Sequence, residues 1–202
     1  MKYILSPFLL SALFWNSCQA YTISGISLED ELAATSEHLK LLLNGAALRE
    51  LYFLVDAFVG GLYLEERSNN AQAIIASKTH KRMVFVVMLE KVGARRIGNK
   101  TQAALVGSIS DEEHSALAGD IDQMLSFFDG KLVKGESVEF DYIPETGTLV
   151  TIKGVKKGII KGDKYFNALL ATWIGKKPIN RNFKRDVLGL NMPSHQIGAA
   201  NN

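Results

Sequence analysis

The amino-acid sequence predicts an α+β domain in which a largely antiparallel sheet carries helices on one face. Two observations indicate this class. Stretches rich in β-branched and aromatic residues, which are typical of strands, are separated by segments whose apolar residues recur at helical spacing. Along the chain, the expected order is strand, helix, strand, helices, three strands and a final helix, as is typical of α+β domains.

Length and composition fit one globular domain. The chain has 202 residues, of which 47% are apolar and 22% charged, so it can bury a sizeable core. No repeats or linkers follow Tyr21, and we expect a single domain over residues 21–190 with a flexible tail over residues 191–202. The formal net charge of +2 does not suggest the concentrated basic face that nucleic-acid binding requires.

The N-terminus has the pattern of a secretory signal peptide over residues 1–20. Lys2 is followed by a mostly apolar run at residues 4–15 and by small residues that end at Ala20. The run is too short to span a membrane, so cleavage after Ala20 would give an exported chain, periplasmic or secreted. Cys18, the only cysteine, has the alternative role of an acylated lipoprotein cysteine, although the three residues before it suit such a site poorly.

Two strands and a short helix are expected in the first half of the domain. Residues 50–64 alternate two sets of side chains that are both mostly apolar, as in a strand covered on both faces. Gly60 and Gly61 mark a bulge or a close backbone approach within it. Residues 82–90 form a second strand of this kind. Between the two, residues 71–77 suit a helix with Asn70 as its N-cap.

The second half begins with two helices. Residues 95–106 suit a helix that Gly98 weakens, whereas residues 111–128 have Ser110 as N-cap, Glu113 for a capping box and an apolar stripe. Short strands are expected at residues 137–143, 148–153 and 158–161, the first two joined by a turn at residues 144–147. A last helix begins at residue 163 or 164, runs to residue 174 and ends at Gly175.

Several kinds of active site find no support. The histidines at positions 38, 80, 114 and 195 show no metal-ligand spacing and are expected on the surface, so neither a metal nor another cofactor is predicted. No nucleophile elbow and no phosphate-binding loop occurs. Lysines between Lys153 and Lys164 surround an expected hairpin, which suits a solvated turn or, as an alternative, a surface for anions or membranes.

Arg49 is the candidate functional residue that stands out. It follows small residues at 44–47, which are expected to form a turn, and precedes the apolar run at residues 50–64. A guanidinium at the mouth of an apolar sheet requires an anionic partner, because burial of an unpaired charge is costly. That partner is either an internal carboxylate, such as Glu50 or Asp56, or the carboxylate of a ligand.

Two groups of residues carry a family resemblance. The first is the small-residue segment at 44–48, followed by Arg49, a core strand and the motif G-x-Y-L-E at residues 61–65. The second is FNALLATWIG at residues 166–175, followed by Pro178, Phe183-Lys184 and VLG at 187–189; the turn PETGT at 144–148 agrees. In these residues, the chain resembles the chalcone isomerase superfamily, and in particular its secreted, chalcone-isomerase-like bacterial branch. The resemblance covers residues 26–190.

The resemblance implies an open-faced β-sandwich, with a large antiparallel sheet, helices on one face and a cleft between them. In catalytic members, a chalcone is cyclised to a flavanone while cationic and hydroxyl groups stabilise the developing charge. In related non-enzymatic members, the arginine and a tyrosine bind the carboxylate of a fatty acid whose tail lies in the apolar cleft. By position, Arg49 matches the family arginine, and Thr172 matches the hydroxyl residue of the last helix.

Other catalytic positions differ. Phe58 occupies the place of a threonine in the enzymes, and residues 95–101 contain no tyrosine for the set on the middle helix. We therefore expect an exported, non-catalytic protein that binds a small hydrophobic carboxylate such as a fatty acid. The alternatives are an intramolecular lyase or isomerase of chalcone-like carbonyl compounds, with Arg49 and Thr172 as catalytic residues, and an envelope interaction protein. The expected ligand-binding residues are Arg49, Phe53, Phe58, Tyr63 and Thr172.

Overall fold

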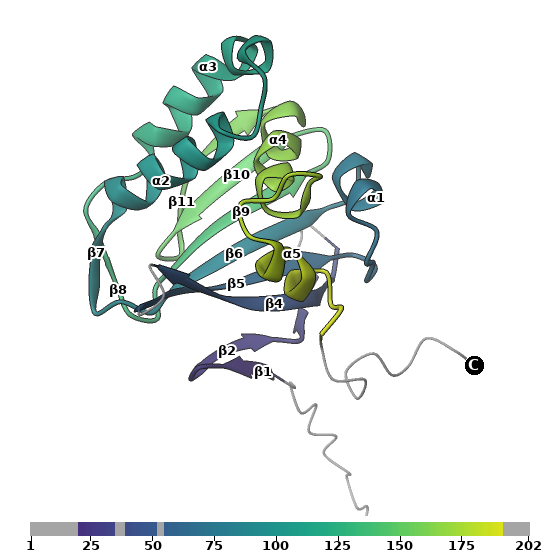
Figure 1. Ribbon diagram of the computed structural model, residues 1–202, viewed down its shortest axis with the longest axis vertical. Helices are drawn as coiled ribbons and strands as arrows, with labels where there is room; N and C mark the ends of the chain where they lie inside the picture. Colours follow the sequence, from purple (N-terminus) through teal and green to yellow (C-terminus); the bar gives the residue numbers. More distant parts are fainter. Residues whose placement is uncertain (1–19, 35–38, 52–54, 192–202) are drawn as a thin grey trace, which may run out of the picture.

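The computed structural model describes residues 20–34, 39–51 and 55–191, which form one curled antiparallel sheet with helices against it (Figure 1). The large sheet has the strand order β11-β10-β9-β6-β5-β4-β3, and each neighbouring pair is antiparallel. Its strands are β3 (Glu31–Leu32), β4 (Leu41–Leu51), β5 (Val55–Leu64), β6 (Lys81–Val87), β9 (Ser137–Ile143), β10 (Gly147–Ile152) and β11 (Val155–Lys161).

The helices share one face of this sheet, which confirms the predicted fold class. All of them contribute buried side chains to a single apolar core on that face, called the helix side below. They are α1 (Ala71–Ala76), α2 (Ala94–Val106), α3 (Asp111–Ser126), α4 (Lys164–Ile174) and α5 (Arg181–Val187). The short pair β7 (Lys91–Gly93) and β8 (Lys131–Val133) flanks the α2–α3 segment in the sequence.

The opposite face, called the outer side below, carries a smaller second core. The hairpin of β1 (Ala20–Ile23) and β2 (Ile26–Glu29) lies below β4 in Figure 1. Its apolar side chains pack with outward-facing residues of β4, β5 and β6, including Leu43, Val59 and Val84. The central strands are therefore covered on both faces at this end, as their two-sided apolar pattern predicted.

Most of the predicted elements are confirmed. Asn70 caps α1 by accepting a hydrogen bond from the Ala73 amide at 3.1 Å, and Ser110 and Glu113 form the predicted capping box of α3. The strand at residues 137–143 and the helix at residues 164–174 have the predicted bounds. Gly98 does not interrupt α2; instead, a Cβ atom there would lie 2.9 Å from the Phe128 ring, so its absence permits close packing.

Two expectations were wrong, and one helix was missed. Residues 44–47 are part of strand β4 and not a turn. The run at residues 50–64 is not one strand, because β4 ends at Leu51 and β5 begins at Val55, with antiparallel pairing between them. Residues 181–187 form helix α5, which was not expected.

A bulge explains why the small residues of β4 are needed. The register with β5 shifts between Leu43 and Gly45, and Asn44 donates a hydrogen bond to the Val187 carbonyl oxygen at 2.9 Å. At Gly45, a Cβ atom would lie 2.3 Å from the Asp186 carbonyl oxygen and 2.6 Å from that of Val187. The end of α5 thus lies directly on the backbone of β4, in a position that only glycine permits.

Lys81 is a buried cation on the helix side. Its side chain is fully buried, and its Nζ donates to the carbonyl oxygens of Ile74 at 2.9 Å and Ser77 at 2.6 Å. The ammonium group also lies 4.9 Å from the centre of the Tyr142 ring. Burial, together with the nearby charge of Lys78, lowers the pKa of Lys81 to about 8.

We expect this lysine to make stability depend on alkaline pH. Between about pH 8 and the ordinary lysine pKa of 10.5, the unfolded chain holds a proton that the folded chain has lost. The free energy of unfolding should therefore rise with pH in this window, by at most about 1.4 kcal/mol per pH unit. Urea unfolding across the window should show this rise in the parent and lose it in Lys81→Met. The exposed Lys91→Met control should retain it; an unchanged slope in Lys81→Met would contradict the assignment.

Candidate functional site

Arg49 lies two residues before the end of β4 and pairs with Phe58 of β5. Directly paired residues of an antiparallel sheet project from the same face, and Phe58 packs against the helix-side core. The neighbouring pair, Leu48 and Val59, belongs instead to the outer core. Arg49 and Phe58 therefore both project on the helix side, which places a cation beside an aromatic ring.

The surroundings of Arg49 suit an anion. Its side chain is half-buried, and this burial lowers the pKa of the guanidinium from its ordinary value. None of the ion pairs between described residues includes Arg49. The side chains of Glu50 and Asp56 lie outside the described part, so an internal partner there stays a prediction. Because arginine remains charged at neutral pH, a partly desolvated guanidinium is stabilised by any carboxylate that reaches it.

Aromatic side chains continue from Phe58 across the helix side. The Phe58 ring meets the Phe85 ring edge-on at 6.5 Å between centroids, and Phe85 in turn lies 4.9 Å from Trp173 of α4. Phe183 of α5 stacks on Phe85 at 6.0 Å. Gly60 makes room for this ring, since a Cβ atom there would lie 2.6 Å from it. We call Phe58, Phe85, Trp173 and Phe183 the aromatic cluster.

The described structure places the other predicted site residues in different surroundings. Tyr63 belongs to the outer core, on the opposite face from Phe58, and its hydroxyl donates to the Glu29 carbonyl oxygen at 2.9 Å. Thr172 is fully buried in α4, and its hydroxyl donates to the Leu169 carbonyl oxygen at 2.7 Å. Phe53 lies outside the described residues. Arg49 and Phe58 are thus the predicted pair that shares a face.

Among the cavities of the described part of the chain, two are considered below, and neither of these is lined by Arg49, Phe58 or Thr172. The edge cavity, of ≈ 290 Å³, is mostly apolar and lies between β1, β4 and residues Asp186 and Asn191 in and after α5. Ala47, two residues before Arg49 on β4, is part of its wall. Two residues of a strand span about 7 Å, so the edge cavity begins close to Arg49. Its lining residues are Tyr21, Ile23, Ala46, Ala47, Leu48, Asp186 and Asn191.

A comparison with protein families matches residues 20–189 to the family described as chalcone isomerase-like. The chain belongs to the chalcone isomerase-like family. The match spans all five helices and the whole large sheet, including the Arg49–Phe58 pair, and it confirms the resemblance at the level of the family.

Solved structures support the same fold for this chalcone isomerase-like chain. The crystal structure of a fatty-acid binding protein of Arabidopsis thaliana superposes with a TM-score of 0.68 over 84% of this chain and 96% of that chain, at 16% sequence identity. At this identity, the similarity concerns the fold. A search of curated proteins gave no match.

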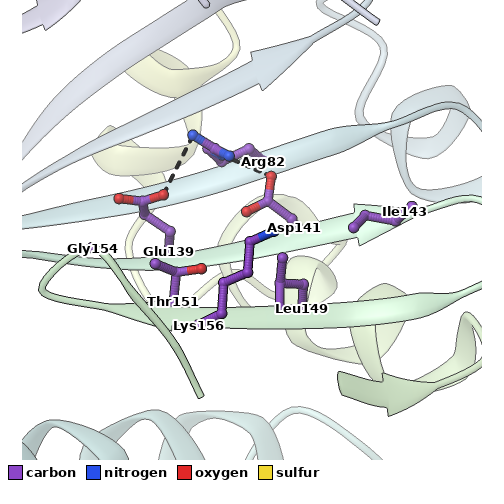
Figure 2. Close-up of a pocket in the computed structure, with 8 residues that line it drawn as sticks. All are labelled: Arg82, Glu139, Asp141, Ile143, Leu149, Thr151, Gly154 and Lys156. Atoms are coloured by element: carbon purple, nitrogen blue, oxygen red, sulfur yellow. Dashed lines mark hydrogen bonds and ion pairs between the residues drawn. The ribbon is translucent and has the colours of Figure 1, made fainter. Parts of the chain in front are cut away.

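A second group of polar residues occupies the outer side of the sheet, where β6, β9 and β10 are adjacent (Figure 2). Asp141 is buried, with 1% of its surface exposed. Its Oδ1 accepts hydrogen bonds from Arg82 Nε at 2.7 Å and from His80 Nε2 at 3.1 Å. Arg82 also pairs with Glu139 at 3.3 Å. Burial opposes the charge on Arg82, but the carboxylates of Asp141 and Glu139 raise the pKa of its guanidinium overall.

This polar group was not predicted. His80 was expected on the surface and is instead 2% exposed, because the fold places it beside Asp141, which is 61 positions away in sequence. A partial signal existed in β9, where Glu139 and Asp141 are two residues apart and so project from one face. Their cationic partner on β6 follows only from the β6–β9 pairing, in which Arg82 lies opposite Asp141.

In residues 20–34, 39–51 and 55–191, no group of three or more His, Cys, Asp or Glu side chains is arranged to hold a metal ion. No helix within the same ranges has the length and apolar character to cross a membrane.

Proposed function

We propose that this protein is an exported, non-catalytic carrier of a small hydrophobic carboxylate such as a fatty acid. The observation that carries the proposal is the environment of Arg49. A half-buried guanidinium with no described carboxylate partner lies on the same face as Phe58 and the aromatic cluster. This arrangement offers one positive charge next to an apolar surface, which complements an amphipathic anion.

In this proposal, the guanidinium of Arg49 donates to the ligand carboxylate, and the acyl chain lies against Phe58 and extends toward the edge cavity at Ala47. A hydrogen bond between charged groups contributes about 1.5–3 kcal/mol. Each buried methylene group adds about 0.8 kcal/mol, so the chain supplies most of the affinity. Tyr63 is not part of this site, since it projects from the other face.

The comparisons support the ligand class. This chain belongs to the chalcone isomerase-like family and shares its fold with a plant fatty-acid binding protein. Two features favour binding over catalysis. Phe58 replaces the hydroxyl expected in the enzymes, and the Thr172 hydroxyl already donates within its own helix. An enzyme would turn over a 2′-hydroxychalcone faster than buffer does, and lose that rate in Arg49→Ala.

Export is proposed from the N-terminal pattern alone. Lys2, the apolar run at residues 4–15 and the small residues before Tyr21 support cleavage after Ala20. N-terminal sequencing of the exported protein checks this: Tyr21 as the first residue supports the signal peptide, and an acylated Cys18 supports the lipoprotein alternative.

The head group of the ligand provides the first test. We expect the purified protein to bind a long-chain fatty acid in a calorimetric or fluorescence titration. The methyl ester of the same acid should bind at least about tenfold more weakly, because it cannot form the charged contact with Arg49. Equal affinity for acid and ester would contradict a carboxylate-binding role. Failure of both to bind would contradict the carrier function itself.

A further inference from the structure

The outer side of the sheet carries a cavity that is separate from the Arg49 site. This outer cavity, of ≈ 200 Å³, opens over β6, β9, β10 and the turn into β11 (Figure 2). Arg82, Asp141 and Thr151 project from the outer face of the sheet, whereas Thr148 of β10 is an odd number of residues from Thr151 and projects on the helix side. Its lining residues are Arg82, Glu139, Asp141, Ile143, Leu149, Thr151, Gly154 and Lys156.

Asp141 gives this cavity an unused hydrogen-bond acceptor. Its Oδ1 accepts from both Arg82 and His80, whereas its Oδ2, although buried, has no hydrogen-bond partner among the described residues. Figure 2 shows this second oxygen turned away from Arg82, on the side from which the Lys156 side chain approaches. A buried carboxylate oxygen without a donor is costly. A ligand that places a donor there would therefore be stabilised.

The remaining groups define the kind of ligand. Arg82 uses Nε and Nη1 on Asp141 and Glu139, and no described residue accepts a hydrogen bond from its Nη2. The Thr151 hydroxyl, which can donate and accept, also has no hydrogen-bond partner in the described part of the chain. The cavity thus presents an acceptor, a donor and a hydroxyl. Arg82 and Lys156 balance the charges of Glu139 and Asp141, so a net charge on the ligand finds no complement.

We propose that the outer cavity is a binding site for a neutral, polyhydroxylated molecule the size of a single sugar ring. Each ligand hydroxyl can donate to Asp141 Oδ2 while it accepts from Arg82, a pairing that an amine or a carboxylate alone does not satisfy. The cavity is smaller than the roughly 300–1,000 Å³ of pockets for drug-sized ligands, which restricts the ligand to a small molecule. Ile143 and Leu149 provide apolar contact for its ring carbons.

The test is an NMR titration. The backbone amide resonances of the isotope-labelled full domain are followed as D-glucose or myo-inositol is added. We expect at least one of these polyols to shift the amides of Arg82, Glu139, Asp141 and Thr151 selectively, with weak, saturable binding. Thr151→Val should weaken that binding at least about threefold, because it removes one hydrogen bond at almost constant volume. Thr148→Val is the matched control on the other face of the same strand and should leave binding unchanged.

A second variant examines the acceptor directly. Asp141→Asn retains one oxygen for Arg82 and His80 but presents an amide donor in place of the free oxygen, so polyol binding should fall at least about tenfold. If Asp141→Asn does not fold, the effect of Thr151→Val on polyol binding tests the proposal. Selective shifts with glycine or acetate but not with the polyols would overturn the proposal. So would the absence of saturable shifts with both polyols, or equal losses in Thr151→Val and Thr148→Val.

Discussion

Asp141→Ala is expected to lower the free energy of unfolding by about 3 kcal/mol, since removal of one partner from a buried ion pair leaves the other charge without compensation. Asp141, on β9, connects three strands. Its side chain accepts hydrogen bonds from Arg82 on β6 and from His80 just before β6, and its backbone pairs with Leu149 on β10. Arg82 would retain only its contact with Glu139 at 3.3 Å.

The exposed ion pair of Asp129 and Lys157 provides a control of the same chemistry. These side chains are 2.8 Å apart, but the Asp129 side chain is 75% exposed. Surface pairs of this kind contribute little to stability, and Asp129→Ala should leave the denaturation midpoint almost unchanged. Chemical denaturation of the three proteins measures the difference. An equal decrease of the free energy of unfolding in Asp141→Ala and Asp129→Ala would mean that the buried contacts of Asp141 with Arg82 and His80 do not hold β6 and β9 together.

Gly45→Ala is expected to lower the free energy of unfolding by a similar amount, about 3 kcal/mol. The added Cβ atom would meet the backbone oxygens of Asp186 and Val187 at 2.3 Å and 2.6 Å. Backbone atoms cannot rotate away as a side chain does, so either α5 must move off β4 or the bulge must straighten. Either change also disturbs the edge cavity, which Asp186 helps to line.

Gly119→Ala is the matched control for this substitution. Gly119 lies in the exposed part of α3, where a Cβ atom would meet nothing within 4 Å. Alanine has the higher helix propensity by up to about 1 kcal/mol, so this variant should be as stable as the parent or slightly more stable. Thermal and urea denaturation give both values. Parent-like stability of Gly45→Ala would contradict the direct packing of α5 on β4.

Local signals account for the elements that the sequence predicted well. The capping box of α3, the N-cap of α1 and the alternation in β9 each depend on residues within a few positions of one another. Strand β4 had no such signal, because its small residues are typical of a turn. They form a strand by pairing with β5, and Asn44 contacts Val187, which is 143 positions away in sequence. Helix α5 is short, and its buried residues, Phe183 and Val187, pack on distant parts of the chain, so the local sequence did not predict it.

The candidate site was predictable in part. The position of Arg49 next to an apolar strand was visible, but its pairing with Phe58 required the hairpin register. The placement of Tyr63 in the same site conflicts with strand geometry: Phe58 and Tyr63 are an odd number of residues apart, so a continuous strand directs them to opposite faces. The network of His80, Arg82 and Asp141 depends on the pairing of β6 with β9, and the local sequence gives little indication of it.

The central claim is that Arg49 holds the carboxylate of a hydrophobic ligand. Its most direct test is a titration with a long-chain fatty acid of the parent, of Arg49→Ala and of Arg96→Ala, an exposed arginine on α2 that serves as the control. We predict that Arg49→Ala weakens binding at least about tenfold, which corresponds to about 1.4 kcal/mol, while Arg96→Ala binds as the parent does. Parent-like affinity in Arg49→Ala, with the fold intact, would contradict the claim.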